Sequence, residues 1–268
     1  MERLSARPFN KASFVIRATL MSLAALTIFG FLTFDYKDVT LIEAMKKTGD
    51  TLEVMLLEPH AKHFTFLEAL KQVLITLGLA FLTTLFGAII AVLLGLLAAR
   101  NLTNGKMSLA VRSAVAFIRA VPTVLWVLIF AVGAGLGSVA AVLGMTFHSV
   151  SYLVKAYSES FEELDDGVVE ALRASGANWW QIVFQAVLPS SISYMISWTF
   201  MRLEINFAVA VAMGAAAGAG GIGFDMFMAS NFYFDVREIG MITYLILIFA
   251  ILLELTARFI KRKLRTNV

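Results

Sequence analysis

A long stretch without a charged residue, from Val73 to Ala99, constrains the fold of this chain more than any other feature. A helix needs about 20 mostly apolar residues to cross the hydrocarbon core of a bilayer. Three further stretches also qualify: 18–34, 187–214 and 239–257. Hydrophobic residues form 59% of the chain and charged residues only 15%, whereas soluble domains carry about 25% charged residues. The sequence therefore predicts an all-α integral membrane protein.

The segment between Arg119 and Lys155 has no formal charge, but Pro122 and several glycines could divide it into two crossings. Basic residues flank the first and the last apolar stretch, and such flanks are typical of the cytoplasmic side. With both termini in the cytoplasm the number of crossings must be even, so this segment is expected to cross twice. The six predicted spans are 18–34, 73–99, 113–132, 138–154, 187–214 and 239–257.

Residues 35–68 would then form an extracytoplasmic loop, and their apolar positions favour an amphipathic helix resting on the membrane surface. The first span ends in bulky residues with no A-x-A-like site, so we expect it to remain uncleaved. His60 and His63 have no obvious third ligand nearby and are expected to be solvated loop residues, with no metal site. His148 is expected to be a helix-end residue.

The composition excludes several chemistries. The chain has no cysteine, so disulfides, thiolate nucleophiles and cysteine-based metal sites are ruled out. The net charge of +3 comes mostly from the ends of apolar stretches, and no basic block indicates nucleic-acid binding. The sequence contains neither G-x-x-x-x-G-K nor G-x-S-x-G, so we expect no ATP site, no bound cofactor and no enzyme activity in this chain.

The predicted cytoplasmic segment 158–186 is too long for a minimal connection between two spans. Phe161, Leu164, Val168 and Leu172 lie at spacings of 3, 4 and 4, which is typical of one face of a helix. Acidic residues outnumber basic ones around this face, so anionic lipid would repel it. Two interpretations remain: a docking element for a cytoplasmic protein, or an acidic connector without a partner.

This segment resembles the E-A-A, G, I-x-L-P pattern of ABC importer permeases. The matching residues are Glu170, Ala171, Gly176, Leu188 and Pro189. Leu172 and Ala186 depart from the pattern, in place of an alanine and an isoleucine. The resemblance implies a coupling helix that sits in a groove of a separate ATPase subunit, which uses ATP and Mg. It also implies two ATPase copies and an extracytoplasmic substrate-binding protein as partners.

Within the importers the chain is similar to the phosphonate permease family, of the PhnE type. The similarity rests on "AARN" at 98–101, "RAVPTVLW" at 119–126, and the stretch 203–223 with "LEINFAVAVAMG" and "GAGGIG". Ala208 departs from the family, which usually has a basic residue there. The resemblance implies import of phosphonate, phosphite or phosphate across the bacterial cytoplasmic membrane, through a pore of two permease copies set in lipid.

Gly218, Gly220 and Gly223 are spaced as G-x-G-x-x-G, and Gly221 lies among them. A dinucleotide site would require a soluble βαβ unit around these glycines, and the sequence provides none. Two compatible interpretations remain: close helix packing by small residues, or a tight turn near an outer gate.

Three polar residues, Arg202, Glu204 and Asn206, lie in the predicted span 187–214. Arg202 and Asn206 are four positions apart and share a helix face, whereas Glu204 points elsewhere. A buried ionisable group costs about 2.5–3.5 kcal/mol on insertion scales, so each should face a partner or a wet cavity. Glu204 could pair with Arg119 in a structural role, or the Arg202 face could line a path for an oxyanion.

Besides a phosphonate-type importer, the sequence leaves three other functions to consider. The chain could be the permease of an ABC importer for another small solute. A secondary transporter driven by an ion gradient should show repeated halves with broken helices, and no convincing repeat is present. A membrane enzyme is disfavoured because the sequence offers no catalytic constellation.

Overall fold

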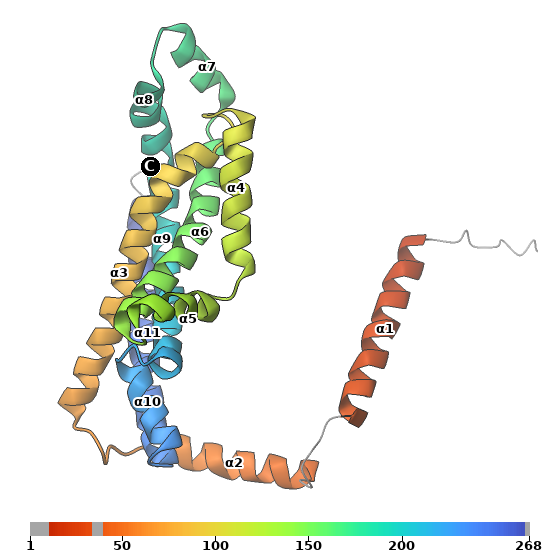
Figure 1. Ribbon diagram of the computed structural model, residues 1–268, viewed down its shortest axis with the longest axis vertical. Coiled ribbons are helices and arrows are strands. Elements are labelled where there is room, and N and C mark those ends of the chain that lie inside the picture. Colours follow the sequence, from red (N-terminus) through yellow and green to blue (C-terminus); the bar gives the residue numbers. More distant parts are fainter. Residues whose placement is uncertain (1–10, 34–39, 266–268) are drawn as a thin grey trace, which may run out of the picture. The chain divides into compact units, whose positions relative to one another are not determined.

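The computed structural model describes residues 11–33 and 40–265, and every regular element within these ranges is helical (Figure 1). The chain divides into two compact units, residues 1–51 and 52–268. Five of the described helices are long and apolar enough to cross a membrane. The predicted all-α membrane fold is therefore confirmed.

The first unit contains α1, Lys11–Thr33, and most of α2, Leu41–Leu57. No residue of α1 is buried, and its surface is apolar nearly all round, as in a helix that faces lipid. The second helix is the amphipathic element predicted for the loop 35–68. The hydroxyl of Thr40 accepts a hydrogen bond from the Glu43 amide at 3.3 Å and begins this helix.

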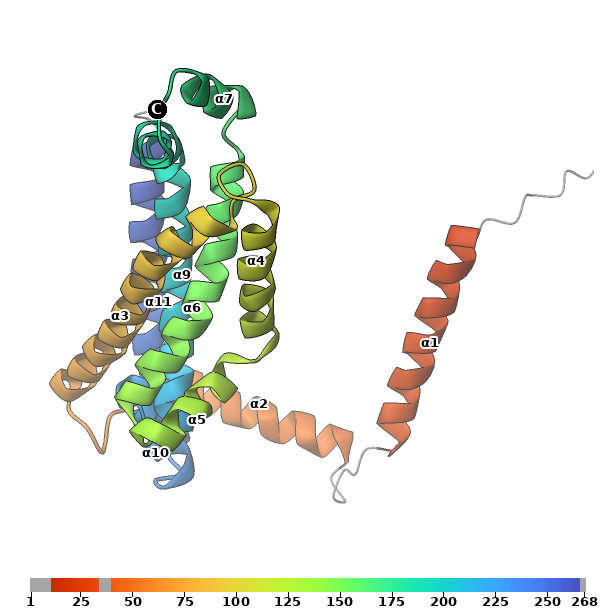
Figure 2. The same ribbon diagram turned by 45° about the horizontal axis from the view of Figure 1, so that its top comes forward.

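Three long helices form the centre of the second unit (Figure 2): α3, Phe66–Ala98; α6, Ser138–Glu162; and α9, Leu188–Ala217. The first two approach closely at Gly87, where an added Cβ would lie 2.8 Å from the Cβ of Ser149. Small residues allow membrane helices to pack this tightly without a large apolar side chain between them.

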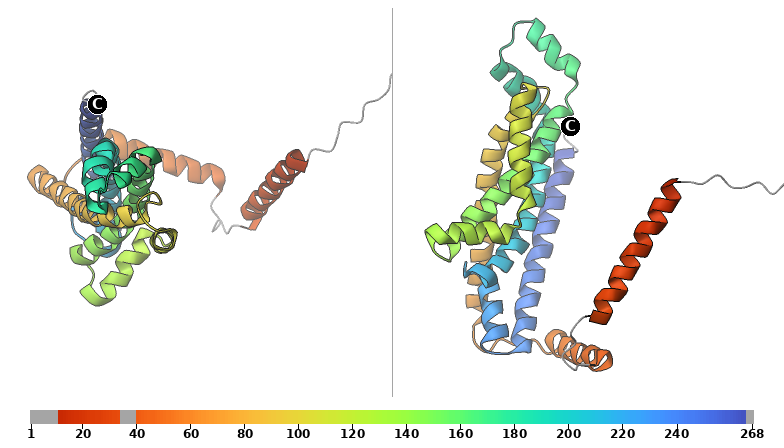
Figure 3. Two further views of the ribbon diagram at one scale, coloured as in Figure 1. Left: turned by 90° about the horizontal axis from the view of Figure 1, so that it is seen from above. Right: turned by 45° about the vertical axis from the view of Figure 1, so that its right-hand side comes forward.

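Two more helices pack against α9: α10, Ile222–Asn231, and α11, Val236–Arg265. The start of α11 and the whole of α10 lie at one end of the unit (Figure 3). The connection between α6 and α9 lies at the opposite end, where α11 also finishes. These two ends correspond to the predicted extracytoplasmic and cytoplasmic sides.

The predicted third span, 113–132, is a broken helix. Its residues belong to α4, Gly105–Ala120, and α5, Thr123–Ala134, whose axes are bent by 92°. Pro122 explains the break, because proline disfavours the helical conformation in the residue before it, and Val121 is extended at φ −92° and ψ 127°. A sixth crossing in the described residues results only if this bent pair counts as one span.

The connection between α6 and α9 consists of α7, Asp166–Ala174, then α8, Trp179–Ile182, and a π-helical turn. The prediction of one helical face from Phe161 to Leu172 is wrong, because Phe161 belongs to α6 and the helix breaks before Asp166. Val169 and Leu172 are the residues of α7 that face the protein, whereas Val168 is exposed.

Candidate functional site

Helix α7 has a defined hydrogen-bonded cap at each end. At the start, a carboxylate oxygen of Asp165 accepts the Gly167 amide at 2.7 Å. At the finish, the Ala177 amide donates to the Leu172 carbonyl and the Gly176 amide donates to Arg173, both at 3.0 Å. This pair of bonds is the Schellman arrangement, and it requires a residue with positive φ. Gly176 adopts φ +87° with open space around it, so its role is conformational.

Of the predicted coupling residues on this short helix, Glu170 and Ala171 lie on its outward side and Leu172 on its inward side. Glu170 and Ala171 are exposed, whereas Val169 is buried and Leu172 is half-buried against the core. One face of α7 is therefore fixed on the protein and the other presents a carboxylate to the surroundings. This geometry suits a docking element.

Two side chains attach α7 and α8 to the loop 99–104, which joins α3 to α4. The guanidinium of Arg173 donates to the Asn101 carbonyl at 3.0 Å, and the indole N–H of Trp179 donates to the Leu102 carbonyl at 3.0 Å. The "AARN" motif at 98–101 covers the first part of this loop, but the sequence does not indicate these two contacts. They depend on donors that reach across more than seventy positions of the chain.

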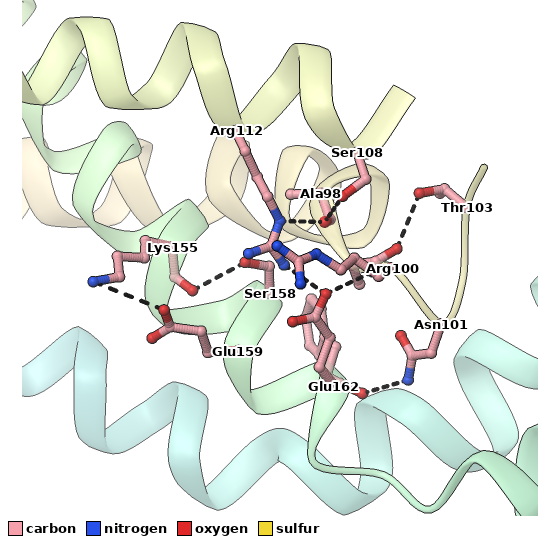
Figure 4. A network of polar contacts seen from close by, with 12 residues as sticks. Ala98, Arg100, Asn101, Thr103, Ser108, Arg112, Lys155, Ser158, Glu159 and Glu162 are labelled. Atoms are coloured by element: carbon pink, nitrogen blue, oxygen red, sulfur yellow. Dashed lines mark hydrogen bonds and ion pairs between the residues drawn. The ribbon is translucent and has the colours of Figure 1, made fainter. Parts of the chain in front are cut away.

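Glu162, at the end of α6, joins the same loop to α4 (Figure 4). Its Oε1 accepts the Arg100 amide at 2.7 Å and the guanidinium of Arg112 at 2.5 Å. Arg112 also donates to the Ala98 carbonyl at 2.9 Å. The amide group of Asn101 donates to the Phe161 carbonyl at 2.9 Å, beside these contacts. The ends of α3, α4 and α6 are thus held together next to α7.

The two remaining pattern residues, Leu188 and Pro189, begin α9. Pro189 is exposed in the first turn of α9, directly after a π-helical turn, so its missing N–H removes a donor inside a continuous helix. Leu188 packs half-buried against the core. The π-helical turn Val183–Val187 directly precedes them, so α8 continues into α9 without a loop.

A second polar site lies within the membrane helices. Arg202 is 2% exposed and Asn206 is fully buried. The guanidinium of Arg202 donates to Ser149 Oγ at 3.0 Å and contacts His148 Nδ1 at 3.1 Å, and it lies 5.2 Å from the ring centroid of Tyr152. The predicted shared face of Arg202 and Asn206 therefore exists and meets α6.

Asn206 connects this site to α3. Its amide group donates to Thr84 Oγ1 and to Ser149 Oγ, both at 2.9 Å. The sequence gives no reason to choose Thr84 or Ser149 among the many hydroxyl residues of the spans. The expectation that His148 is a helix-end residue is wrong, because it lies inside α6 and contacts Arg202.

Arg119 and Glu204 are not brought together. Both are half-buried, and no ion pair involves either of them among the residues that the structure describes. The same holds for Arg202, whose positive charge has no carboxylate within salt-bridge distance in the described ranges. The pairing of Glu204 with Arg119 that the sequence left open is therefore absent from this structure.

The glycine-rich stretch forms the turn between α9 and α10. Gly218, Gly220 and Gly221 all have positive φ, at 62°, 78° and 75°. At Gly223 an added Cβ would lie 1.8 Å from the carbonyl oxygen of Val211, so this glycine permits close helix packing. Both interpretations of the stretch agree with this geometry, since three glycines shape the turn and one serves the contact.

Comparison with known proteins identifies the family. Residues 91–266 match the family described as "Binding-protein-dependent transport system inner membrane component". The chain belongs to this family. The matched range includes α7 with its caps, Arg202 and Asn206, and the glycine-rich turn. The resemblance to importer permeases is confirmed at the level of the family.

Two relatives of this transport family carry phosphorus-related names. The phosphite transport system permease protein PtxC of Stutzerimonas stutzeri is 31% identical over 186 residues, which cover 69% of this chain and 67% of that protein. The phosphate-import permease protein PhnE of Mycolicibacterium smegmatis is 29% identical over 178 residues, covering 66% of this chain. The match spans only 33% of the mycobacterial protein.

Solved structures of transport complexes share the fold. The inward-facing MetNI methionine ABC transporter aligns with a TM-score of 0.69 and 23% identity, over 76% of this chain and 99% of that chain. A bacterial ABC transporter involved in alginate import aligns with a TM-score of 0.63 and 16% identity, over 95% and 99% of the two chains. The importer-type transmembrane fold is thereby confirmed.

Proposed function

We propose that the chain is the permease subunit of an ATP-driven importer in a bacterial cytoplasmic membrane. One observation carries the proposal: α7 presents Glu170 outward while Arg173 and Trp179 fix α7 and α8 to the loop between α3 and α4. A separate ATPase would bind the exposed face of α7, and a second permease copy would complete the pore. An external binding protein would deliver the solute at the opposite end.

The contacts around α7 define how a displacement would spread. A displacement of α7 and α8 would be transmitted through Arg173 and Trp179 to the backbone of Asn101 and Leu102. It would therefore also move the adjoining ends of α3 and α4. The same loop is held by Glu162, which adds α6 to the moving group. Because these contacts end on backbone atoms and fixed ion pairs, the helix ends would move as one body during alternating access.

A phosphorus oxyanion is the cargo that we propose. Arg202 offers five N–H donors, of which its bonds to Ser149 and His148 use two. Its buried charge has no carboxylate partner in the described residues, so an anion in passing would gain from it. The names of the phosphite and phosphate relatives agree with this chemistry. A D-methionine permease relative makes an amino acid the second candidate.

Uptake by the reconstituted complex tests the cargo. Vesicles that contain this chain, its co-purified ATPase and its binding protein should take up phosphite, phosphate or methylphosphonate when ATP is supplied. Arg202→Gln should lower this uptake by about tenfold or more, because a charge-assisted hydrogen bond contributes about 1.5–3 kcal/mol and 1.4 kcal/mol corresponds to tenfold. Glu254→Gln, an exposed change on α11, is the matched control.

The outcomes separate the alternatives. Uptake of D-methionine without uptake of any phosphorus oxyanion would retain the permease and reject the cargo. Uptake that needs no ATP and no ATPase would reject the importer in favour of a secondary transporter. Charge reversal at the exposed Glu170 should leave insertion intact and abolish ATP-dependent uptake, and normal uptake in Glu170→Lys would argue against docking at α7.

A further inference from the structure

At the end of the unit opposite α7, two histidines meet two carboxylates. His60 Nε2 lies 3.0 Å from Asp235 Oδ2, and His63 Nδ1 lies 2.8 Å from Glu238 Oε2. The histidines come from the segment before α3 and the carboxylates from the start of α11. Both histidines lie in the loop between α2 and α3 and are partly exposed, as expected, but each also contacts a carboxylate about 175 positions away in sequence, which the sequence did not indicate.

The carboxylates of this cluster are oriented by the backbone. Glu238 Oε1 accepts the amides of Lys62 and His63 at 3.2 and 2.8 Å. Asp235 Oδ1 accepts the amides of Arg237 and Glu238 at 3.1 and 3.2 Å. Each carboxylate thus uses one oxygen for amides and presents the other to an imidazole. Such support by surrounding groups is what orients the ligands of protein metal sites.

The spacing of the nitrogen and oxygen atoms suits a small divalent ion. One ligand atom each from His63, Asp235 and Glu238 lies within 4.8 Å of the other two. Four ligands at about 2.0–2.1 Å from a tetrahedral zinc ion are about 3.3 Å apart, so small side-chain shifts would enclose one. His60 lies outside this group of three and contacts Asp235 Oδ2 at 3.0 Å, so a water molecule would complete the four ligands. The ring of His63 is stacked on Tyr233 at 3.8 Å.

The accessibility of the donors also fits. The side chains of His60 and His63 are 39% and 31% exposed, whereas those of Asp235 and Glu238 are 17% and 1% exposed. An ion could therefore reach the histidines from the surroundings and find the carboxylates already in place. A mixed imidazole and carboxylate set favours transition metals over Ca²⁺ and Mg²⁺, which prefer oxygen ligands.

We infer that His63, Asp235 and Glu238 form a binding site for a divalent transition-metal ion such as Zn²⁺, with His60 positioning Asp235 through its contact at 3.0 Å. The ion would join the segment before α3 to the start of α11 on the predicted extracytoplasmic side. This site is independent of the cargo path and of the ATPase contact, so its failure would leave the proposed transport function untouched.

Metal titration of the purified full chain, stripped with a chelator, tests the site. Zn²⁺ should bind with one site per chain, and Co²⁺ should give the visible absorption of a tetrahedral ion. Excess Ca²⁺ or Mg²⁺ should not displace either metal. His63→Ala and Asp235→Asn should each weaken Zn²⁺ binding by about tenfold or more. Glu58→Gln, which alters a carboxylate paired with Arg237 at the same end, is the matched control.

Thermal unfolding without metal identifies any variant that fails to fold. If His63→Ala fails to fold, the nearly isosteric Asp235→Asn is used to test the site. Equal Zn²⁺ affinity in the wild type and in the folded variants would overturn the inference. A Co²⁺ spectrum typical of six-coordinate, water-rich ions would do the same. If Zn²⁺ has no effect and the variants merely lose stability, the cluster is a set of ion pairs and the metal site is rejected.

Discussion

The two ends of the second unit are held together by different kinds of contact. At the α7 end, Arg173 and Trp179 donate to backbone carbonyls, and Glu162 forms an ion pair with Arg112 and accepts a backbone amide. At the other end, the contacts between segments are mostly between imidazoles and carboxylates, such as His63 and Glu238. The first kind ends mainly on backbone atoms, whereas the second joins side chains of the types that we propose to hold a metal ion.

This difference matches the work proposed for each end. A contact that transmits force must hold while the motor runs, and an N–H of Arg173 or Trp179 that donates to a backbone carbonyl needs no ionised acceptor. A contact at the outer surface experiences whatever ions surround the cell. The comparison therefore predicts that changes at the α7 end act on stability and coupling, while changes at the outer end depend on pH and metal.

The largest effect is expected at Glu162. Replacing it with alanine removes the partner of Arg112 and the acceptor of the Arg100 amide. Hydrogen bonds to charged groups contribute about 1.5–3 kcal/mol, so Glu162→Ala should destabilise the chain by about 2–3 kcal/mol. Thermal unfolding in detergent measures this loss, and ATP hydrolysis without uptake would show that α6 has been released from the loop 99–104.

Glu159 provides the matched control on the same helix, and it is drawn beside Glu162 in Figure 4. It lies 3.8 Å from Lys155 and both side chains are half exposed. Exposed pairs contribute about 0–1 kcal/mol, so Glu159→Ala should change stability little. Equal losses in the two variants would mean that the network around Glu162 has no special role.

The next effect is expected at Gly176. A residue with a Cβ pays about 1–2 kcal/mol in the left-handed region, and Gly176 has φ +87°. Gly176→Ala should therefore loosen the end of α7 by this amount and lower coupling, although no atom obstructs the added methyl group. Gly105→Ala, which also has open space and begins α4, should be neutral in the same uptake and hydrolysis assays.

The sequence predicted the parts of the fold that local rules control. Apolar length located the spanning helices, and Gly176 marked a helix end because its backbone freedom acts within a few residues. Pro189 did not mark a helix start, because α8 runs through the π-helical turn into α9 without a break. The break at Pro122 was noted, but the 92° bend depends on how α5 packs against α6. The spacing that predicted one helix through Phe161 and Leu172 was misleading, because Phe161 is a buried residue of α6 and Leu172 belongs to the separate helix α7.

The candidate sites divide in the same way. Arg202 and Asn206 could be found because polar residues are rare in an apolar span. Their partners Ser149 and Thr84 could not, because hydroxyl residues are common in membrane helices and only the fold selects among them. The carboxylate contacts of His60 and His63 could not be found either, because Asp235 and Glu238 lie on a distant helix.

A smaller effect is expected at Trp179, and it separates a hydrogen bond from simple aromatic packing. Trp179→Phe keeps the apolar contact but removes the donor to the Leu102 carbonyl. A neutral hydrogen bond contributes about 1 kcal/mol, so unfolding stability should fall by that amount and ATPase-driven uptake should fall with it. Trp180→Phe is the control, since that side chain is 56% exposed. Equal behaviour of the two variants would argue against a rigid link at Leu102.

The smallest effect is expected at Asp225 on α10, near the outer end. Burial, with the nearby charges of Glu238 and Glu68, raises the pKa of Asp225 from 3.8 to about 6. A raised pKa means that the folded state binds the proton more tightly, so stability should rise as the pH falls through 6 towards 3.8. The group is half exposed and solvent screens it, so the gain should stay below about 1 kcal/mol. Asp225→Asn should remove this pH dependence and stabilise the chain slightly at pH 7, whereas Glu162→Ala should keep it. If the slope of unfolding temperature against pH is the same in Asp225→Asn and in the wild type, Asp225 is not the source of the pH dependence. The two ends of the unit would then not differ in this respect.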